Sequence, residues 1–134
     1  MIRACALAAG IIVGLGLAIP PAALAVDYHC VPLEVAVLEK LVHVECAPPA
    51  PLTRGGFPKD TGHEIRFFAI SLSENPAWIE RFIQIANIAI TSGRPMRLSF
   101  DSGDYDGEAF GCLRQDCRTV KAFAILRTAI VPVP

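Results

Sequence analysis

The sequence predicts a mainly β domain with one α-helix, and three observations lead to that prediction. Short segments in which apolar and polar residues alternate recur along the chain, as they do in half-buried strands. A single longer segment repeats its apolar residues at steps of three and four, which is the pattern of an amphipathic helix. Clusters of proline and glycine separate these segments, so each one ends in a turn or loop.

The first 25 residues carry the three parts of a secretory signal. Arg3 is a minimal positive region, residues 4–19 form an apolar run, and residues 23–25 read Ala-Leu-Ala, a small-residue cleavage site. Two prolines end the apolar run before the roughly 20 residues that a membrane span needs, which disfavours an uncleaved anchor. We therefore expect cleavage after Ala25, a periplasmic or secreted protein, and no stable membrane anchor after cleavage.

Cleavage would leave residues 26–134, a length that suits a single domain with a modest core. Arg3 is one of 12 basic residues, so 11 remain against 13 acidic ones. The net charge is then about −2 with neutral histidines. A chain with this balance lacks the basic surface that nucleic-acid binding requires, and we expect no nucleic-acid partner.

Cys5 is lost with the signal, and four cysteines remain: Cys30, Cys46, Cys112 and Cys117. An even number of cysteines in an oxidising compartment predicts two disulfides. Of the three possible pairings we favour Cys30 with Cys46, which brackets a predicted hairpin, and Cys112 with Cys117, which brackets a short loop. A zinc site would need closely spaced cysteine pairs on both sides, and Cys30 and Cys46 each stand alone.

Alternation predicts four strands, the first two of which form a hairpin around Glu39 and Lys40, and a segment dense in Ile and Phe predicts a fifth. The predicted strands are residues 33–38, 42–46, 64–72, 96–100 and 120–128. Residues 47–63 are rich in proline and glycine and predict a long surface loop without regular structure.

The predicted helix covers residues 76–92. Asn75 is a candidate N-cap, Pro76 occupies the favoured first position, and Gly93 provides a stop. The apolar face is broader than one small sheet needs to cover, so we expect part of it to meet a second copy of the chain. That face contains Trp78, Ile79, Phe82, Ile83, Ile85, Ala86, Ala89 and Ile90.

Three strands, one helix and two further strands form the element order of the OB fold, a partly open five-stranded barrel. The stretches LVHVEC (41–46), IRFFA (65–69), AITSGRP (89–95) and the pair of cysteines in 111–118 are similar to a pattern in small exported bacterial proteins without an established activity. On these grounds residues 28–128 resemble the OB-fold class that includes the B subunits of AB5-type bacterial toxins. The resemblance implies a ring assembled around the helices, with glycan-binding loops at one face, and it identifies no sugar-contacting residue in this chain.

Candidate binding residues are the basic and aromatic side chains of the last three predicted strands and their loops, where OB-type barrels often bind ligands. Arginines would contribute hydrogen bonds, and aromatic rings would stack on a sugar. The alternative is that outward-facing arginines protect strand edges and keep a small domain in solution. The candidates are Arg66, Phe68, Arg97, Tyr105, Phe110, Arg114, Arg118 and Lys121.

Residues 101–108 form an acidic, glycine-containing loop that raises the possibility of a calcium or enzymatic site. An EF-hand register fails because Ser102 would occupy position one and Leu113 position twelve, which leaves no bidentate carboxylate. An acidic turn between two strands is the favoured interpretation.

Signatures of catalysis are missing from the sequence. His29, His43 and His63 fall on separate elements, and Ser71 and Ser73 lie outside any G-x-S-x-G elbow. If both disulfides form, no mature cysteine remains to act as a nucleophile. We therefore expect a protein that is not an enzyme and has no cofactor or metal.

These observations favour an exported OB-like binding domain that self-associates through its helix and binds a glycan, peptide or protein through loops. The alternative is a structural or inhibitory partner protein of the cell envelope. In that alternative, either the loop around Gly55 and Gly56 or the loop between Cys112 and Cys117 inserts into the cleft of another protein.

Overall fold

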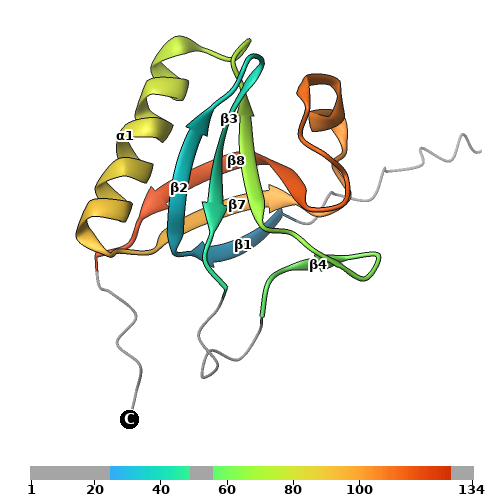
Figure 1. Cartoon of the computed structure of the whole chain (residues 1–134), viewed down its shortest axis with the longest axis horizontal. Coiled ribbons are helices and arrows are strands. Elements are labelled where there is room, and N and C mark those ends of the chain that lie inside the picture. The colour runs from blue at the N-terminus through green and yellow to red at the C-terminus, as the bar shows by residue number, and fades with distance from the viewer. Residues whose placement is uncertain (1–24, 49–55, 128–134) are drawn as a thin grey trace, which may run out of the picture.

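The computed structural model describes residues 25–48 and 56–127 (Figure 1). These residues form a mainly β structure with one α-helix, as the sequence predicts. The predicted export signal falls on residues 1–25 and therefore lies almost entirely outside the described residues. No helix in the described ranges is long and apolar enough to cross a membrane.

Six strands make the main sheet, in the order β1-β7-β8-β6-β3-β2. The strands are β1 (Ala25–Cys30), β2 (Pro32–Val37), β3 (Leu41–Cys46), β6 (Phe67–Ser71), β7 (Met96–Asp101) and β8 (Cys117–Ile125). Neighbouring strands are antiparallel except for β6 and β8, which run parallel. The mainly β class with one helix is confirmed, but the predicted partly open barrel of five strands was wrong in its strand number, because the sheet has six strands and is mostly open, with β1 and β2 at the two ends of its order.

The strand that the sequence analysis missed is β1, which pairs with β7 from Ala25 opposite Asp101 to Cys30 opposite Met96. Val26 and Tyr28 are its only large apolar residues before Cys30, and the predicted cleavage site falls directly after its first residue, Ala25. Its alternation was therefore too short to stand out. A single residue, Val31, separates β1 from β2.

A two-stranded ribbon occupies the end of the segment 47–63 that was predicted to have no regular structure, and it extends to Glu64. Its strands are β4 (Lys59–Asp60) and β5 (His63–Glu64). Thr61 and Gly62 join them with φ angles of 49° and 88°. Positive φ at both central residues matches the twist of a tight hairpin, and Gly62 adopts it without steric cost. The next strand, β6, accordingly begins at Phe67 rather than at residue 64.

The helix α1 (Pro76–Ser92) has the predicted ends. The Asn75 side chain accepts a hydrogen bond from the Ala77 N–H at 2.9 Å, which caps the first turn. Gly93 adopts a left-handed conformation, with φ of 65°, and ends the helix. The helix lies beside β2 and also contacts β3, β7 and β8 (Figure 1).

Most of the apolar face of α1 is covered within the chain, contrary to the expected surplus. Phe82, Ala86 and Ala89 are buried, and Trp78 and several isoleucines pack against the core. The helix contacts four strands rather than one face of a small sheet, so more of its surface is covered than its amphipathic pattern indicated. Ile88, which is not part of the predicted apolar face, is 52% exposed.

Aromatic residues form the centre of the core. Phe68 meets Phe100 edge-on with ring centroids 5.1 Å apart, and Tyr28 stacks on Phe68 at 5.7 Å. Phe123 joins the helix to the sheet through contacts with Trp78 and Phe82, at centroid distances of 4.4 and 5.1 Å. Each edge-to-face or offset pair of rings contributes about 0.5–1.5 kcal/mol of stability beyond that from the burial of its surface area.

Both favoured disulfides are present. Cys30–Cys46 joins the ends of β1 and β3, with a Cα–Cα distance of 5.3 Å. Cys112–Cys117 closes the short loop before β8, with a Cα–Cα distance of 5.2 Å. The second bridge packs with Leu41 into a small separate cluster beside the main core.

Candidate functional site

The predicted binding loops are organised around Arg118, whose side chain is completely buried. Its Nε donates to the Ser102 carbonyl at 2.9 Å, and its Nη1 donates to the carbonyls of Arg114 and Cys117 at 2.7 and 2.6 Å. Its Nη2 donates to the Asp60 carboxylate at 2.5 Å. These bonds occupy the guanidinium inside the protein, so Arg118 joins loops and is not available to a ligand.

Tyr105 lies against this arginine. Its hydroxyl donates to the Asp60 carboxylate, and its ring centroid lies 4.0 Å from the Cζ of Arg114 and 4.7 Å from that of Arg118. The hydrogen bond from Tyr105 lowers the pKa of Asp60, and the Arg118 charge lowers that pKa further, against an opposing effect of burial. With two guanidinium groups against its ring, Tyr105 has little aromatic surface left for a sugar.

The acidic loop is also engaged internally. Asp104 forms an ion pair with Lys121. Burial tends to raise the pKa of Asp104, but the bonds from Lys121 and from the Asp106 N–H outweigh it and lower the pKa. Asp101 accepts a hydrogen bond from the Gly103 N–H at 2.9 Å, which is the local bond of an Asx turn. Within the described residues, no three potential ligands among His, Cys, Asp and Glu lie close enough to hold a metal ion.

The remaining predicted residues do not converge on one surface. Phe68 is fully buried in the core, so the expectation that it stacks on a ligand was wrong. Phe110, at the end of the 3₁₀ helix η1 (Asp106–Phe110), packs on the cluster beside the second disulfide. Arg97 is exposed on β7. Arg66 lies over the Phe57 ring at 5.3 Å, and its buried Nε has no hydrogen-bond acceptor among the described residues.

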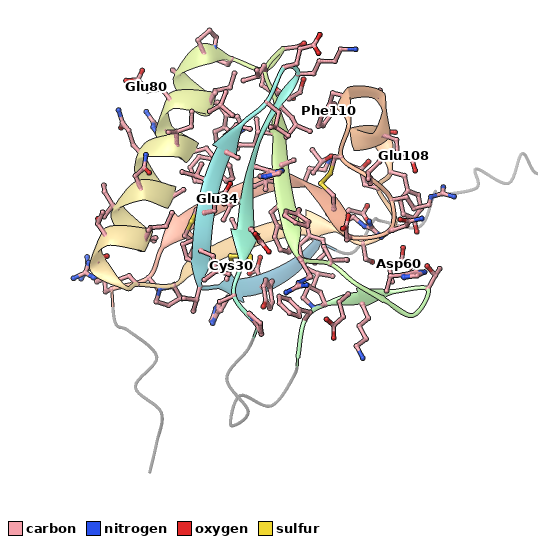
Figure 2. The ribbon with its side chains drawn as sticks, viewed as in Figure 1. Cys30, Glu34, Asp60, Glu80, Glu108 and Phe110 are labelled. Carbon is pink, nitrogen blue, oxygen red and sulfur yellow. A yellow bond between two sulfur atoms is a disulfide. The ribbon has the colours of Figure 1, made fainter. Side chains whose placement is uncertain are left out.

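Figure 2 shows where this polar cluster lies. Asp60 is on the β4–β5 ribbon, on the same side of the molecule as Glu108 of η1, whereas Glu80 of α1 is on the opposite side. The Glu108 carboxylate lies 3.8 Å from Arg114, and both side chains are more than half exposed, so this pair adds little to stability. The predicted binding face is therefore mainly a structural cluster that ties the ribbon to η1 and β8.

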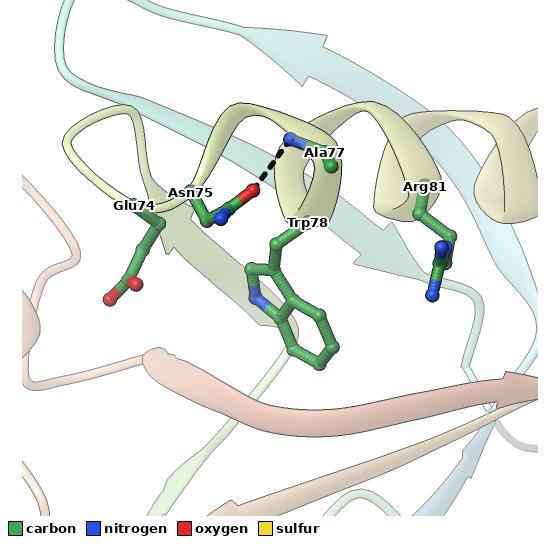
Figure 3. A pocket seen from close by; sticks show the side chains of 5 residues that line it. All are labelled: Glu74, Asn75, Ala77, Trp78 and Arg81. Atoms are coloured by element: carbon green, nitrogen blue, oxygen red, sulfur yellow. Dashed lines mark hydrogen bonds between the residues drawn. The ribbon is translucent and has the colours of Figure 1, made fainter.

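A different surface is hollowed at the start of α1. The hollow has a volume of about 430 Å³, opens widely to solvent, and is lined by Glu74, Asn75, Ala77, Trp78 and Arg81. Glu74 and Asn75 lie just before the helix, and Ala77, Trp78 and Arg81 follow them at steps of three and four, which return to the same face. In Figure 3 the side chains of Glu74 and Arg81 lie on either side of the Trp78 indole, and all three extend to the same side of the helix.

Trp78 is the only aromatic residue that lines this hollow, and it is firmly placed. Its ring packs on Phe123 of β8 at a centroid distance of 4.4 Å and an interplanar angle of 51°. The ring is only partly buried, so part of the indole remains at the surface of the hollow. An aromatic ring held in a fixed orientation by the core is a suitable platform for a ligand, since no side-chain freedom is lost on binding.

Most polar side-chain groups of the hollow form no hydrogen bond or ion pair with another described residue, the exception being the capping oxygen of Asn75. Glu74 and Arg81 are exposed and form no ion pair or side-chain hydrogen bond with any residue that the structure describes. Asn75 uses its Oδ1 to cap the helix, which leaves its amide N–H groups free within the same ranges. The hollow thus combines an aromatic ring with free hydrogen-bond donors and acceptors. In the predicted binding loops around Arg118, by contrast, most polar side chains already bind one another or the backbone.

Sequence reasoning missed this site because it assigned Trp78 to the helix core. The spacing of Glu74, Trp78 and Arg81 places one acid, one tryptophan and one base on a single face at the helix start. That pattern was available in the sequence. The apolar periodicity of the helix concealed it.

No protein-family model, no curated protein and no solved structure matches this chain.

Proposed function

We propose that this chain is an exported, non-enzymatic binding domain that holds a glycan in the hollow at the start of α1. The observation that supports this proposal is the partly exposed Trp78 ring beside Glu74 and Arg81, which form no ion pair with any described residue, and beside the free amide N–H groups of Asn75. Binding sites for small ligands are concave, offer apolar or aromatic surface, and carry a few polar groups that fix orientation. Sugar rings present apolar C–H faces and hydroxyl groups to such a surface.

The strand order supports an OB-like relationship as part of this proposal. Because only Val31 separates β1 from β2, the two can be regarded as one strand that pairs with β7 at one end and with β3 at the other. Regarded in this way, the chain has three strands, a helix and two strands, and its sheet order returns to the strand where it began. That order is compatible with a partly open barrel in which α1 packs beside β2.

Export is the second part of the proposal. The two disulfides are stable in an oxidising compartment, and no described helix is suited to cross a membrane. Both findings are compatible with a protein that leaves the cytoplasm. The signal that would direct it lies in residues 1–25.

Self-association is the third part of the proposal. It is now supported by exposed apolar residues on α1 and β2 rather than by the apolar face of α1 alone. Most of the apolar face of α1 is covered, but α1 and its neighbour β2 together leave three large apolar side chains more than half exposed. These are Leu33 (54%), Val37 (60%) and Ile88 (52%). Exposed apolar residues on adjoining elements are typical of an interface.

Tryptophan fluorescence tests the glycan proposal directly, because Trp78 is the only tryptophan in the sequence. A glycan array first selects ligands for the purified mature protein. We expect a selected glycan to change the Trp78 emission in a saturable way, and Arg81→Ala to weaken that response. Arg97→Ala, at an exposed arginine outside the hollow, should leave it unchanged. If the protein retains a glycan without any change in the Trp78 emission, the glycan binds at a surface other than this hollow.

An inhibitory or structural partner protein is the second candidate, and the loop between Cys112 and Cys117 favours it. Leu113 is 61% exposed at its start, and the Arg114 side chain is 59% exposed beside it. The Cys117 N–H donates to the Leu113 carbonyl at 2.9 Å, and Arg118 donates to the Arg114 carbonyl, so two hydrogen bonds and a disulfide hold the loop. This candidate would be favoured if the wild type binds no glycan and captures one protein in a stoichiometric amount, and if the Leu113→Asp variant no longer captures that protein.

A further inference from the structure

The hollow at the start of α1 has two opposite charges at its two sides. Glu74 precedes the helix, Arg81 lies in its second turn, and the Trp78 indole lies between them (Figure 3). Neither charge is paired with another residue of the described ranges. The arrangement is therefore dipolar, and a complementary ligand carries both signs of charge.

The end of the helix does not provide a separate anion site. Asn75 already accepts hydrogen bonds at its Oδ1 from Ala77 and at its backbone carbonyl from Trp78 and Ile79. Pro76, the first helical residue, has no N–H to donate. An anionic group in this hollow would thus depend on the Arg81 guanidinium, with help from the Asn75 amide.

A cationic group would find two partners at the other side. The Glu74 carboxylate supplies charge, and the Trp78 ring supplies a π face, the best of the aromatic side chains for a cation. A purely anionic ligand would be repelled by Glu74, and a purely cationic one by Arg81. A neutral sugar would leave both charges without a partner.

From this geometry we infer that the hollow recognises a zwitterionic group, with a substituted ammonium between Glu74 and Trp78 and a phosphate or carboxylate at Arg81. The inference rests on the proposed function, and it specifies the part of the glycan that the site recognises. Zwitterionic substituents are compact enough to place both charges within one hollow of about 430 Å³.

Titration of the Trp78 emission tests this inference with small probes. Phosphocholine and glycine betaine carry the same quaternary ammonium with a phosphate or a carboxylate, and together they identify the preferred anion. Choline and inorganic phosphate carry charge of a single sign, and glucose carries none. We expect at least one zwitterion to bind about fivefold or more tightly than each of these three, in line with one added charge-assisted contact. Equal binding of glucose or of phosphate alone would overturn the inference.

Charge-neutralising variants locate the two ends of the ligand. Glu74→Gln and Arg81→Gln should each weaken zwitterion binding by about five- to tenfold. Glu80→Gln and Arg94→Gln make the same changes of charge on or just beyond the same helix, outside the hollow, and should leave binding unchanged. Equal effects from the control variants would show that the net charge of the protein matters rather than the hollow, and would overturn the inference.

The source of the zwitterion is separable from its chemistry. Capture by a phosphocholine-substituted carbohydrate, without co-sedimentation on phosphatidylcholine vesicles, is the result that supports a glycan. Binding to the vesicles but not to the carbohydrate would show that the zwitterion belongs to a lipid headgroup, and would overturn the assignment to a glycan. If neutral glycans bind and charge has no effect, the proposed function stands and the zwitterion is wrong. If no glycan, zwitterionic or neutral, moves the Trp78 emission, both fail.

Discussion

Arg118 donates a hydrogen bond to Asp60 at 2.5 Å, across 58 positions of sequence, and the arginine side chain is completely buried. This contact fastens the β4–β5 ribbon to β8, and Tyr105 closes over it. Replacing the arginine would remove the side-chain donor from three carbonyl groups and leave Asp60 with Tyr105 as its remaining donor. Unpaired buried polar groups are costly, so the cluster is a concentrated source of stability.

We expect Arg118→Met to lower the free energy of unfolding by about 2–4 kcal/mol, measured by urea denaturation. Arg118→Lys should recover only part of the loss, because an ammonium group cannot reproduce the planar fork that reaches three carbonyls and a carboxylate. Arg97→Met is the matched control at an exposed site and should change stability by no more than about 0.5 kcal/mol. A loss of similar size in both methionine variants would contradict the structural role of Arg118.

The same cluster predicts that part of the free energy of unfolding is lost at acidic pH. The hydrogen bond from Tyr105 and the charge of Arg118 hold the pKa of Asp60 below its ordinary value in the folded state. A carboxylate with a depressed folded pKa contributes stability above its unfolded pKa, near 3.9, and loses that contribution as the pH falls through the folded pKa. The difference in unfolding free energy between the wild type and Asp60→Asn should be largest near pH 7 and should shrink below about pH 4.

Urea denaturation at pH 7, 4 and 3 measures this difference. Asp116→Asn is a control, because Asp116 lies close in sequence to the cluster and its side chain forms no ion pair with the described residues. A difference between the wild type and Asp60→Asn that stays constant over this pH range would show that the carboxylate charge is not what the cluster uses.

Local chemistry explains which parts of the fold were predictable. The ends of α1 follow from Asn75, Pro76 and Gly93, because caps depend on residues within one turn. The disulfide Cys112–Cys117 follows from proximity in sequence. Each of these features is determined by neighbours along the chain.

Features that depend on distant residues were not predictable in the same way. Nothing around Asp60 indicates that its partners are Tyr105 and Arg118, which lie 45 and 58 positions away. The basic residues of the last strand therefore resembled a binding face, although the structure uses Arg118 internally. Trp78 shows the reverse case, a residue that was assigned to the core and also lines a surface hollow. Its side chain packs on Phe123 and still borders the hollow.

Gly107 offers a test of close packing beside the second disulfide. A Cβ at this position would lie 2.8 Å from the Cβ of Cys112 and 2.9 Å from the Oγ1 of Thr119. We expect Gly107→Ala to lower the melting temperature through overpacking worth about 1–3 kcal/mol. At Gly103 the nearest atom would be 3.6 Å away, so Gly103→Ala should be close to neutral. Equal melting temperatures of the two variants would show that the loop yields without cost.

Assembly through α1 and β2 is tested by the mass of the mature protein in solution. We expect light scattering at tens of micromolar to give a mass above that of one chain, and Ile88→Glu or Val37→Glu to reduce it, because a buried unpaired charge opposes association. Leu113→Glu places the same charge at an equally exposed site away from those elements and should leave the mass unchanged. A wild type with the mass of one chain would remove this part of the proposal.

The two disulfides should contribute unequally to stability. Cys30 and Cys46 are 16 positions apart, whereas Cys112 and Cys117 are 5 apart. In the chain-entropy account a longer closed loop restricts the unfolded state more, which gives about 3 kcal/mol for the first bridge and about 2 kcal/mol for the second. Urea denaturation of the two double alanine variants measures both values, and the four cysteines are similarly buried, so the cavities left behind are comparable. A larger loss from the shorter bridge would indicate that Cys112–Cys117 acts in the folded state, by holding the loop carbonyls where Arg118 binds them.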